Sequence, residues 1–111
     1  MSANVRSEQV PGAGTSSATF EQPELQSGIS AFLVKVTKGR GPKAHKHPYA
    51  ETFFVHSGVG EFVVNGLAYK ATEGDIVVVN AGEAHQFTSI GDVPLAMTCV
   101  HASDKMETEW L

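Results

Sequence analysis

The sequence has 111 residues, of which 41% are hydrophobic and 18% are charged, and its formal net charge is −4 at pH 7. A chain of this length fits one domain with a sizeable core and leaves no room for two. The negative net charge disfavours general binding to nucleic acid or to an anionic membrane. The single cysteine, Cys99, excludes an intrachain disulfide and a cysteine-rich zinc site.

Membrane insertion and export are also disfavoured by the sequence. The first residues lack the apolar run of a signal peptide. The longest aliphatic runs, at residues 31–34 and 76–79, are far shorter than the ~20 residues that span a bilayer. We therefore expect a cytoplasmic protein with no membrane or nucleic-acid partner.

The beginning of the chain differs in composition from the rest. Residues 1–17 are rich in Ser, Gly and Ala, contain a Pro11-Gly12 turn and have almost no apolar periodicity. Such a segment is flexible in isolation. We expect residues 1–17 to form a flexible segment or an arm, and residues 18–111 to form one domain.

From residue 30 onward, short strand-like runs alternate with turn residues. The runs are rich in Val, Phe, Ile and Thr, and they cover residues 31–37, 51–56, 61–64, 67–70, 75–79, 85–89 and 95–101. Asn65-Gly66 is the strongest hairpin signal among the turns. No segment keeps a 3.6-residue apolar period over three turns, although residues 103–111 are compatible with one helical turn carrying Met106 and Trp110 on one face. The pattern predicts an all-β sandwich, jelly roll or small barrel.

Four residues of metal-binding type fall in two short segments. His45 and His47 are two apart, so in a strand their imidazoles point to one face. Glu51 follows at an even offset, and His85 begins a later strand. Three imidazoles and one carboxylate suit a divalent Fe, Mn, Ni, Zn, Co or Cu ion, and around an octahedral ion they leave two positions open. The alternative is a polar cluster satisfied by ordinary hydrogen bonds.

The same segments resemble the two motifs of the cupin superfamily. Residues 39–58 match G-x5-H-x-H-x3-E-x6-G at every fixed position. Residues 74–89 are similar to G-x5-P-x-G-x2-H-x3-N at Gly74, Gly82 and His85, with Asn80 in place of Pro and Ser89 in place of Asn. Neither departure removes a metal ligand. The resemblance covers residues 30–101 and the spacing is that of small single-domain cupins.

This resemblance implies a double-stranded β-helix, the cupin jelly-roll barrel, as the fold of residues 18–111. It also implies that His45, His47, Glu51 and His85 bind the metal inside the barrel near one mouth. Similar small cupins form dimers, so a homodimer is the expected assembly.

Other residues are candidates for the wall of a substrate pocket. Strand parity turns Phe53, Val55 and Phe87 inward, together with Phe62 and Val64, and a core role competes with a pocket role for all of them. Cys99 and His101 share one face of the last strand, and Tyr49 lies between two metal-ligand candidates. His56 has the opposite parity and is expected to point outward.

Five positive residues lie close together in the segment that runs into the first metal-ligand candidate: Lys35, Lys38, Arg40, Lys43 and Lys46. Part of this basic cluster could steer an anionic small molecule towards the metal. The simpler interpretation is a solvated strand and loop balanced by the twelve acidic residues of the chain.

The resemblance and the metal-ligand candidates favour a metalloenzyme that acts on a small organic molecule. A redox-active ion would suit dioxygenase chemistry, and a Lewis-acid ion would suit isomerase, cyclase or lyase chemistry. The alternative is a non-catalytic module that binds or senses a small ligand through the same metal. The residues do not separate these possibilities.

Overall fold

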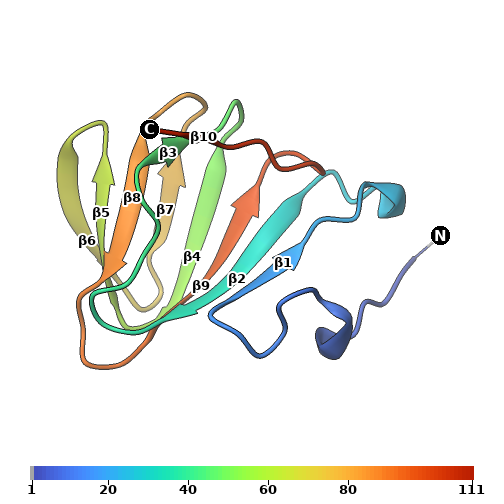
Figure 1. The fold of residues 1–111 in the computed structure, drawn as a ribbon, viewed down its shortest axis with the longest axis horizontal. Helices are drawn as coiled ribbons and strands as arrows, with labels where there is room; N and C mark the ends of the chain where they lie inside the picture. Colours follow the sequence, from blue (N-terminus) through green and yellow to red (C-terminus); the bar gives the residue numbers. More distant parts are fainter. Residues whose placement is uncertain (1) are drawn as a thin grey trace.

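The computed structural model describes residues 2–111, which fold into two five-stranded antiparallel sheets (Figure 1). The first sheet has the order β1 (Ser17–Phe20), β2 (Ser30–Val36), β9 (Leu95–His101), β4 (Glu51–Ser57) and β7 (Ile76–Val79). The second has the order β10 (Glu109–Trp110), β3 (His45–Lys46), β8 (His85–Ser89), β5 (Val59–Val64) and β6 (Leu67–Thr72). Two 3-10 turns, η1 (Ser7–Gln9) and η2 (Pro23–Leu25), lie in the N-terminal part.

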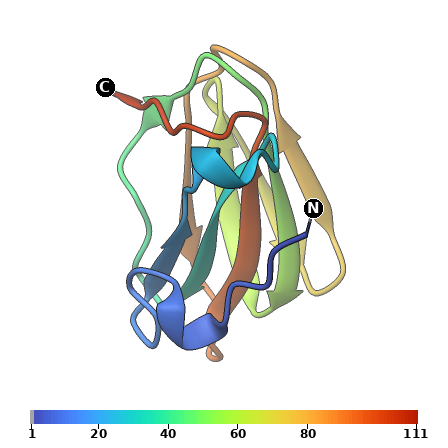
Figure 2. The ribbon, with the colours of Figure 1, turned by 90° about the vertical axis from the view of Figure 1, so that its right-hand side faces the viewer.

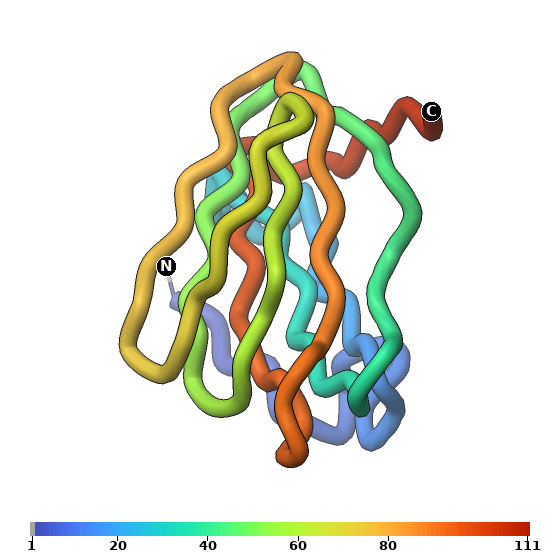
Figure 3. Tube along the Cα trace, turned by 90° about the vertical axis from the view of Figure 1, so that its left-hand side faces the viewer, coloured from blue at the N-terminus to red at the C-terminus, as the bar shows by residue number. Residues whose placement is uncertain are grey.

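Consecutive strands repeatedly pass from one sheet to the other, which is the winding of a jelly roll. Strands β5, β6 and β8 lie in front of β9, β2 and β1 in Figure 3. The expected all-β, double-stranded β-helix is therefore confirmed. All seven expected strands are present, and β8 and β9 have the expected bounds.

The β5–β6 hairpin shows why its turn was readable from the sequence. Asn65 and Gly66 have φ values of 49° and 82°, so both occupy the left-handed region that a two-residue hairpin turn requires. Val64 pairs with Leu67 directly across that turn.

The core lies between the two sheets and follows strand alternation. Phe53, Val55, Phe62 and Phe87 are buried, as parity predicts, and Val64 is partly buried against them. His56 points outward as expected, is exposed, and forms a 2.7 Å hydrogen bond to the Thr98 hydroxyl.

The C-terminal segment does not form the expected helical turn. Its backbone groups bond to distant residues: the Met106 amide donates to Glu21 Oε2 at 2.6 Å, and the Leu111 amide donates to the Ala44 carbonyl at 3.1 Å. These contacts replace those of a helix, so the segment runs extended across one end of the sandwich and pairs with β3 as β10 (Figure 2). The prediction of a helix at residues 103–111 was wrong because these contacts are non-local.

At the other end of the chain, η1 precedes β1, which pairs antiparallel with β2 from Ser17↔Val34 to Phe20↔Ala31. The division into residues 1–17 and a domain from residue 18 stays a prediction. No helix within residues 2–111 is long and apolar enough to cross a membrane.

Candidate metal centre

Three separate parts of the fold bring the four predicted metal-ligand residues together. His45 and His47 come from β3 and the residue after it, whereas Glu51 begins β4 and His85 begins β8. His45 pairs directly with His85 across the β3–β8 ladder. One ligand atom from each of the four residues lies within 4.8 Å of the others, and all four side chains are buried.

The three histidines are held in the same tautomer by the backbone. Nδ1 of His45 lies 2.7 Å from the Lys43 carbonyl, Nδ1 of His47 lies 2.7 Å from the Glu107 carbonyl, and Nδ1 of His85 lies 2.9 Å from the Glu83 carbonyl. A carbonyl oxygen only accepts, so each Nδ1 carries the proton. In a neutral ring the Nε2 lone pair is then free, and the backbone fixes its direction as in metal-binding histidines.

The Nε2 atom of His47 is buried and has no hydrogen-bond partner among residues 2–111. It lies 3.1 Å from Glu51 Oε1, but outside hydrogen-bonding geometry. A buried polar atom without a partner is costly unless something else satisfies it. An orphaned lone pair beside two more imidazoles and a carboxylate oxygen fits one divalent metal ion.

The charges within the cluster shift the pKa values of its members. Burial alone would raise the pKa of Glu51, but the hydrogen bond from His101 and the nearby imidazoles of His47 and His85 hold that pKa well below its usual range. Burial lowers the pKa of His45. Burial would also lower the pKa of His47, but the Glu51 carboxylate and the Glu107 carbonyl outweigh it and raise that pKa. Glu51 is therefore ionised and ready to bind a cation.

A second set of hydrogen bonds supports Glu51 from behind. His101, which is fully buried, places Nε2 3.1 Å from Glu51 Oε2. Its Nδ1 lies 2.7 Å from the Tyr49 hydroxyl, which accepts a hydrogen bond from the Glu107 amide at 3.0 Å. The ionised carboxylate of Glu51 can only accept a hydrogen bond, so His101 donates to it from Nε2. The Nδ1 atom of His101 then accepts a hydrogen bond from the Tyr49 hydroxyl.

The C-terminal segment contributes directly to the site. The Thr108 hydroxyl lies 3.3 Å from His47 Nδ1, and the Trp110 ring centroid lies 4.9 Å from that of His45. Thr108 and Trp110 also line the cavity beside the cluster, and the Glu107 backbone holds His47.

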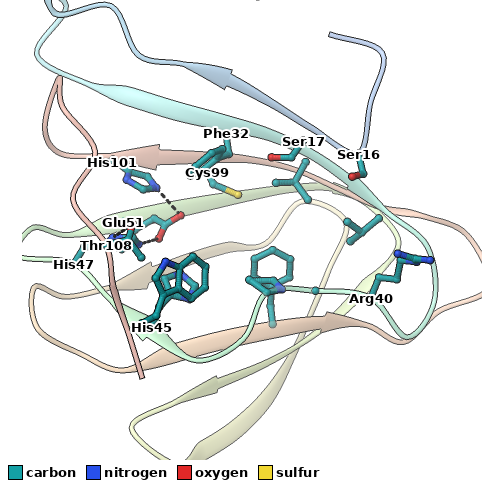
Figure 4. A pocket seen from close by; sticks show the side chains of 16 residues that line it. Ser16, Ser17, Phe32, Arg40, His45, His47, Glu51, Cys99, His101 and Thr108 are labelled. Atoms are coloured by element: carbon teal, nitrogen blue, oxygen red, sulfur yellow. Dashed lines mark hydrogen bonds and ion pairs between the residues drawn. The ribbon is translucent and has the colours of Figure 1, made fainter. Parts of the chain in front are cut away.

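A cavity of about 390 Å³ opens beside the cluster (Figure 4). His45, His47 and Glu51 lie at one side of it, and its walls include the apolar side chains of Phe32, Val34, Val36, Pro42, Phe87 and Cys99. The size is that of sites for small organic ligands. Burial raises the pKa of the Cys99 thiol well above its usual value, so the thiol stays neutral and serves as wall.

The expected pocket residues have different positions in the structure. Phe87, Cys99 and His101 line the cavity. Phe53 and Val55 instead pack in the core between the sheets. Tyr49 contacts the site through its hydrogen bond to His101 and by stacking on His47, with ring centroids 5.2 Å apart.

Residues 32–101 match the family model of the Cupin domain. This chain belongs to the cupin family. The match covers most of the chain and both motif segments, so the resemblance inferred from the sequence is confirmed.

Solved structures similar to this cupin share its fold. A double-stranded β-helix protein from Klebsiella pneumoniae has a TM-score of 0.70 and 24% identity, over 75% of this chain and 70% of that one. An oxalate decarboxylase from Bacillus subtilis, studied for its Mn(II) centres, has a TM-score of 0.78 and 24% identity, over 94% of this chain and 30% of that one. At this identity the likeness shows the fold alone.

Curated relatives of this cupin include the HTH-type transcriptional activator RhaR. The Salmonella arizonae protein is 35% identical over 51 residues, which are 46% of this chain and 18% of that protein. The Enterobacter protein is 29% identical over 68 residues, which are 60% of this chain and 24% of that protein. The chain thus spans only a small part of these relatives.

Sequence reasoning missed several residues that shape the cupin's site. The pairing of β10 with β3 brings three of them to the site: Glu107, Thr108 and Trp110. No short-range sequence pattern predicts a strand of two residues. Ser16 and Ser17 line the cavity because β1 pairs with β2. Arg40 was visible as part of the basic cluster, but its position in the cavity wall depends on the fold.

Proposed function

We propose that this cupin binds one divalent transition-metal ion at His45, His47, Glu51 and His85 and acts as a metalloenzyme on a small organic molecule. The observation that carries the proposal is the buried, unpartnered Nε2 of His47, which lies among the other three donors. The cavity next to these donors offers space for a small ligand at the open metal positions.

A bound ion would polarise a carbonyl oxygen as a Lewis acid or, if redox-active, support dioxygenase chemistry. The residues of the chain orient the metal ligands and form the wall around the bound small molecule. Glu107, Lys43 and Glu83 orient the three imidazoles through their carbonyl groups, and His101 holds Glu51 in place. The apolar wall excludes water from the bound ligand. Both the dioxygenase type and the isomerase, cyclase or lyase type stay compatible with this arrangement.

The second candidate is a module that senses a small ligand without transforming it. The observation that favours it is the similarity to part of RhaR, a transcriptional activator. In that case the same metal and cavity would hold a ligand that the protein releases unchanged. Product analysis after incubation with a bound ligand separates the two functions, since only an enzyme consumes it.

Elemental analysis of the purified protein, expressed without a metal-binding tag, tests the metal site. We expect near-stoichiometric divalent metal in the wild type and its loss in His47→Ala. His56→Ala is the matched control, because His56 is exposed and bonded to Thr98 on the outer face. Wild-type protein that holds no metal even after reconstitution would overturn the proposal, as would a His47→Ala variant that keeps it.

A further inference from the structure

The structure separates one member of the basic cluster from the others. Lys38 pairs with Asp92 at 3.4 Å and Lys46 pairs with Glu109 at 3.5 Å. Among the cluster's five members, only Arg40 lines the cavity. Within residues 2–111, none of the ion pairs involves Arg40. Its guanidinium is therefore a cation in the cavity wall that no carboxylate of residues 2–111 neutralises.

The backbone around Arg40 is fixed against β8. The Gly39 amide donates to the Ser89 carbonyl at 2.7 Å, and the Ser89 amide donates to the Arg40 carbonyl at 2.9 Å. A Cβ atom added to Gly41 would lie 1.8 Å from the Phe87 carbonyl oxygen, so only glycine permits this close approach. Arg40 thus starts from a defined position on the wall, although its side chain is exposed.

Apolar side chains lie between the metal-ligand residues and Arg40. Figure 4 shows Arg40 at the opposite side of the pocket from His47, Glu51 and His101. Phe32, Val34, Val36, Phe87 and Cys99 form the walls of the same cavity. The cavity therefore has a polar end at the metal-ligand residues, apolar walls, and a far end where Arg40 supplies the cation and Ser16 also lines the wall.

We propose that Arg40 binds a carboxylate of the ligand, so that the substrate class is an elongated small acid with two acidic ends. Its first end chelates the metal through adjacent oxygens, its apolar middle contacts the cavity walls, and its second carboxylate bonds to Arg40. This inference rests on the proposed metal-dependent function and adds the chemical class of its substrate.

The charges favour one carboxylate at the second end. Within the part of the chain that the structure describes, Arg40 is the only Lys or Arg side chain that lines the cavity, so it supplies a single positive charge there. The planar guanidinium fork matches the two oxygens of a carboxylate, which a lysine does not do in the same way. A doubly charged group would leave an unneutralised negative charge beside apolar walls.

The test compares pairs of 2-oxo acids of equal chain length on protein loaded with Co²⁺. In each pair, such as 2-oxoadipate and 2-oxohexanoate, both acids can chelate the ion but only one has a distal carboxylate. A series from 2-oxoglutarate to 2-oxopimelate covers different distances to Arg40. Binding is followed by calorimetry, and the visible spectrum of Co²⁺ reports entry of the ligand into the coordination sphere.

We expect at least one dicarboxylate to bind tenfold tighter than its partner, and this advantage to disappear in Arg40→Gln and to be only partly kept in Arg40→Lys, which retains the charge but not the two-pronged guanidinium. Lys38→Gln, which removes an exposed cation outside the cavity, should keep the full advantage. Equal affinities within every pair, or an advantage that survives in Arg40→Gln, would overturn the inference while the metal site stands. Failure of the wild-type protein to hold Co²⁺ or any other divalent ion would instead overturn the proposed function, and with it this inference.

Discussion

His101 donates a hydrogen bond from Nε2 to Oε2 of Glu51 at 3.1 Å, while the other carboxylate oxygen faces His47 and His85. Glu51 is thereby divided between two tasks: Oε2 is held by the protein, and Oε1 is offered to the metal-ligand cluster. Residues that orient a metal ligand in this way raise affinity without touching the ion.

We expect His101→Phe to weaken metal binding by about 10- to 100-fold, which is the usual effect of losing such a supporting residue. The reason is that Glu51 would then rotate and lose the orientation of Oε1. Dissociation constants from competition with a chelator measure the effect, and circular dichroism checks the fold. His56→Phe provides the histidine control, since His56 lies outside the site. Unchanged affinity in His101→Phe would show that the hydrogen bond does not orient Glu51.

Tyr49 should have a smaller effect through the same chain of hydrogen bonds. Tyr49→Phe removes the hydroxyl that donates to His101 and accepts from the Glu107 amide. His101 keeps its bond to Glu51, so we expect a loss of metal affinity below that of His101→Phe. In the double variant the two losses should be less than additive, because both act through one chain. Fully additive losses would contradict a shared path.

Metal affinity should fall as the pH is lowered, and protonation of His47 should contribute to this loss before protonation of His45. A ligand imidazole must be neutral. The Glu51 carboxylate and the Glu107 carbonyl raise the pKa of His47, so in metal-free protein part of it is still protonated just above pH 6.5. Burial lowers the pKa of His45, which is neutral at the same pH. Binding near neutral pH should therefore release protons, and affinity should decrease steeply below ~6.5.

Calorimetry of metal binding in two buffers of different ionisation enthalpy measures these protons. Affinity that stays constant from pH 8 to pH 5, with no proton release, would argue against histidine ligands.

The sequence predicted those parts of the site that depend on short spacing. His45 and His47 share a strand face, and the two motifs place Glu51 and His85 beside them, so the spacing and the motifs were enough to predict the cluster of four. Alternation likewise placed Phe53 and Phe62 inside. These features depend on residues within one strand or one motif.

Contacts between distant segments were not readable. The Glu107 carbonyl binds His47 across 60 positions of sequence, and nothing near residue 107 indicates such a role. His101 was a candidate pocket residue from its strand face, but its hydrogen bonds to Glu51 and Tyr49 were not predicted because these partners come from elsewhere in the chain. Such roles follow from strand pairing, which a single sequence specifies only through the complete fold.

Gly41 should be intolerant of a side chain. Gly41→Ala would place a Cβ atom 1.8 Å from the Phe87 carbonyl oxygen, so the loop or β8 must move. We expect this variant to lose about 1–3 kcal/mol of folding stability, as for other overpacking substitutions, and to lose the Arg40-dependent part of ligand affinity. Gly91→Ala is the matched control, since its Cβ would meet only ordinary contacts near Val59 at 3.4 Å. Equal thermal stability of the two variants would mean that the backbone at residue 41 can move away from β8 at little cost in free energy.

Trp110 should report occupancy of the metal site by its fluorescence. It is the only tryptophan of the chain, and its ring centroid lies 4.9 Å from that of His45. A Cu²⁺ or Co²⁺ ion held by His45 would therefore quench its emission, in proportion to the fraction of sites filled. The same ions should leave the emission of His47→Ala unchanged at concentrations that saturate the wild type. Quenching of equal strength in both proteins would mean that the ion binds near Trp110 without His47. The ion would then lie outside the proposed cluster, which includes His47.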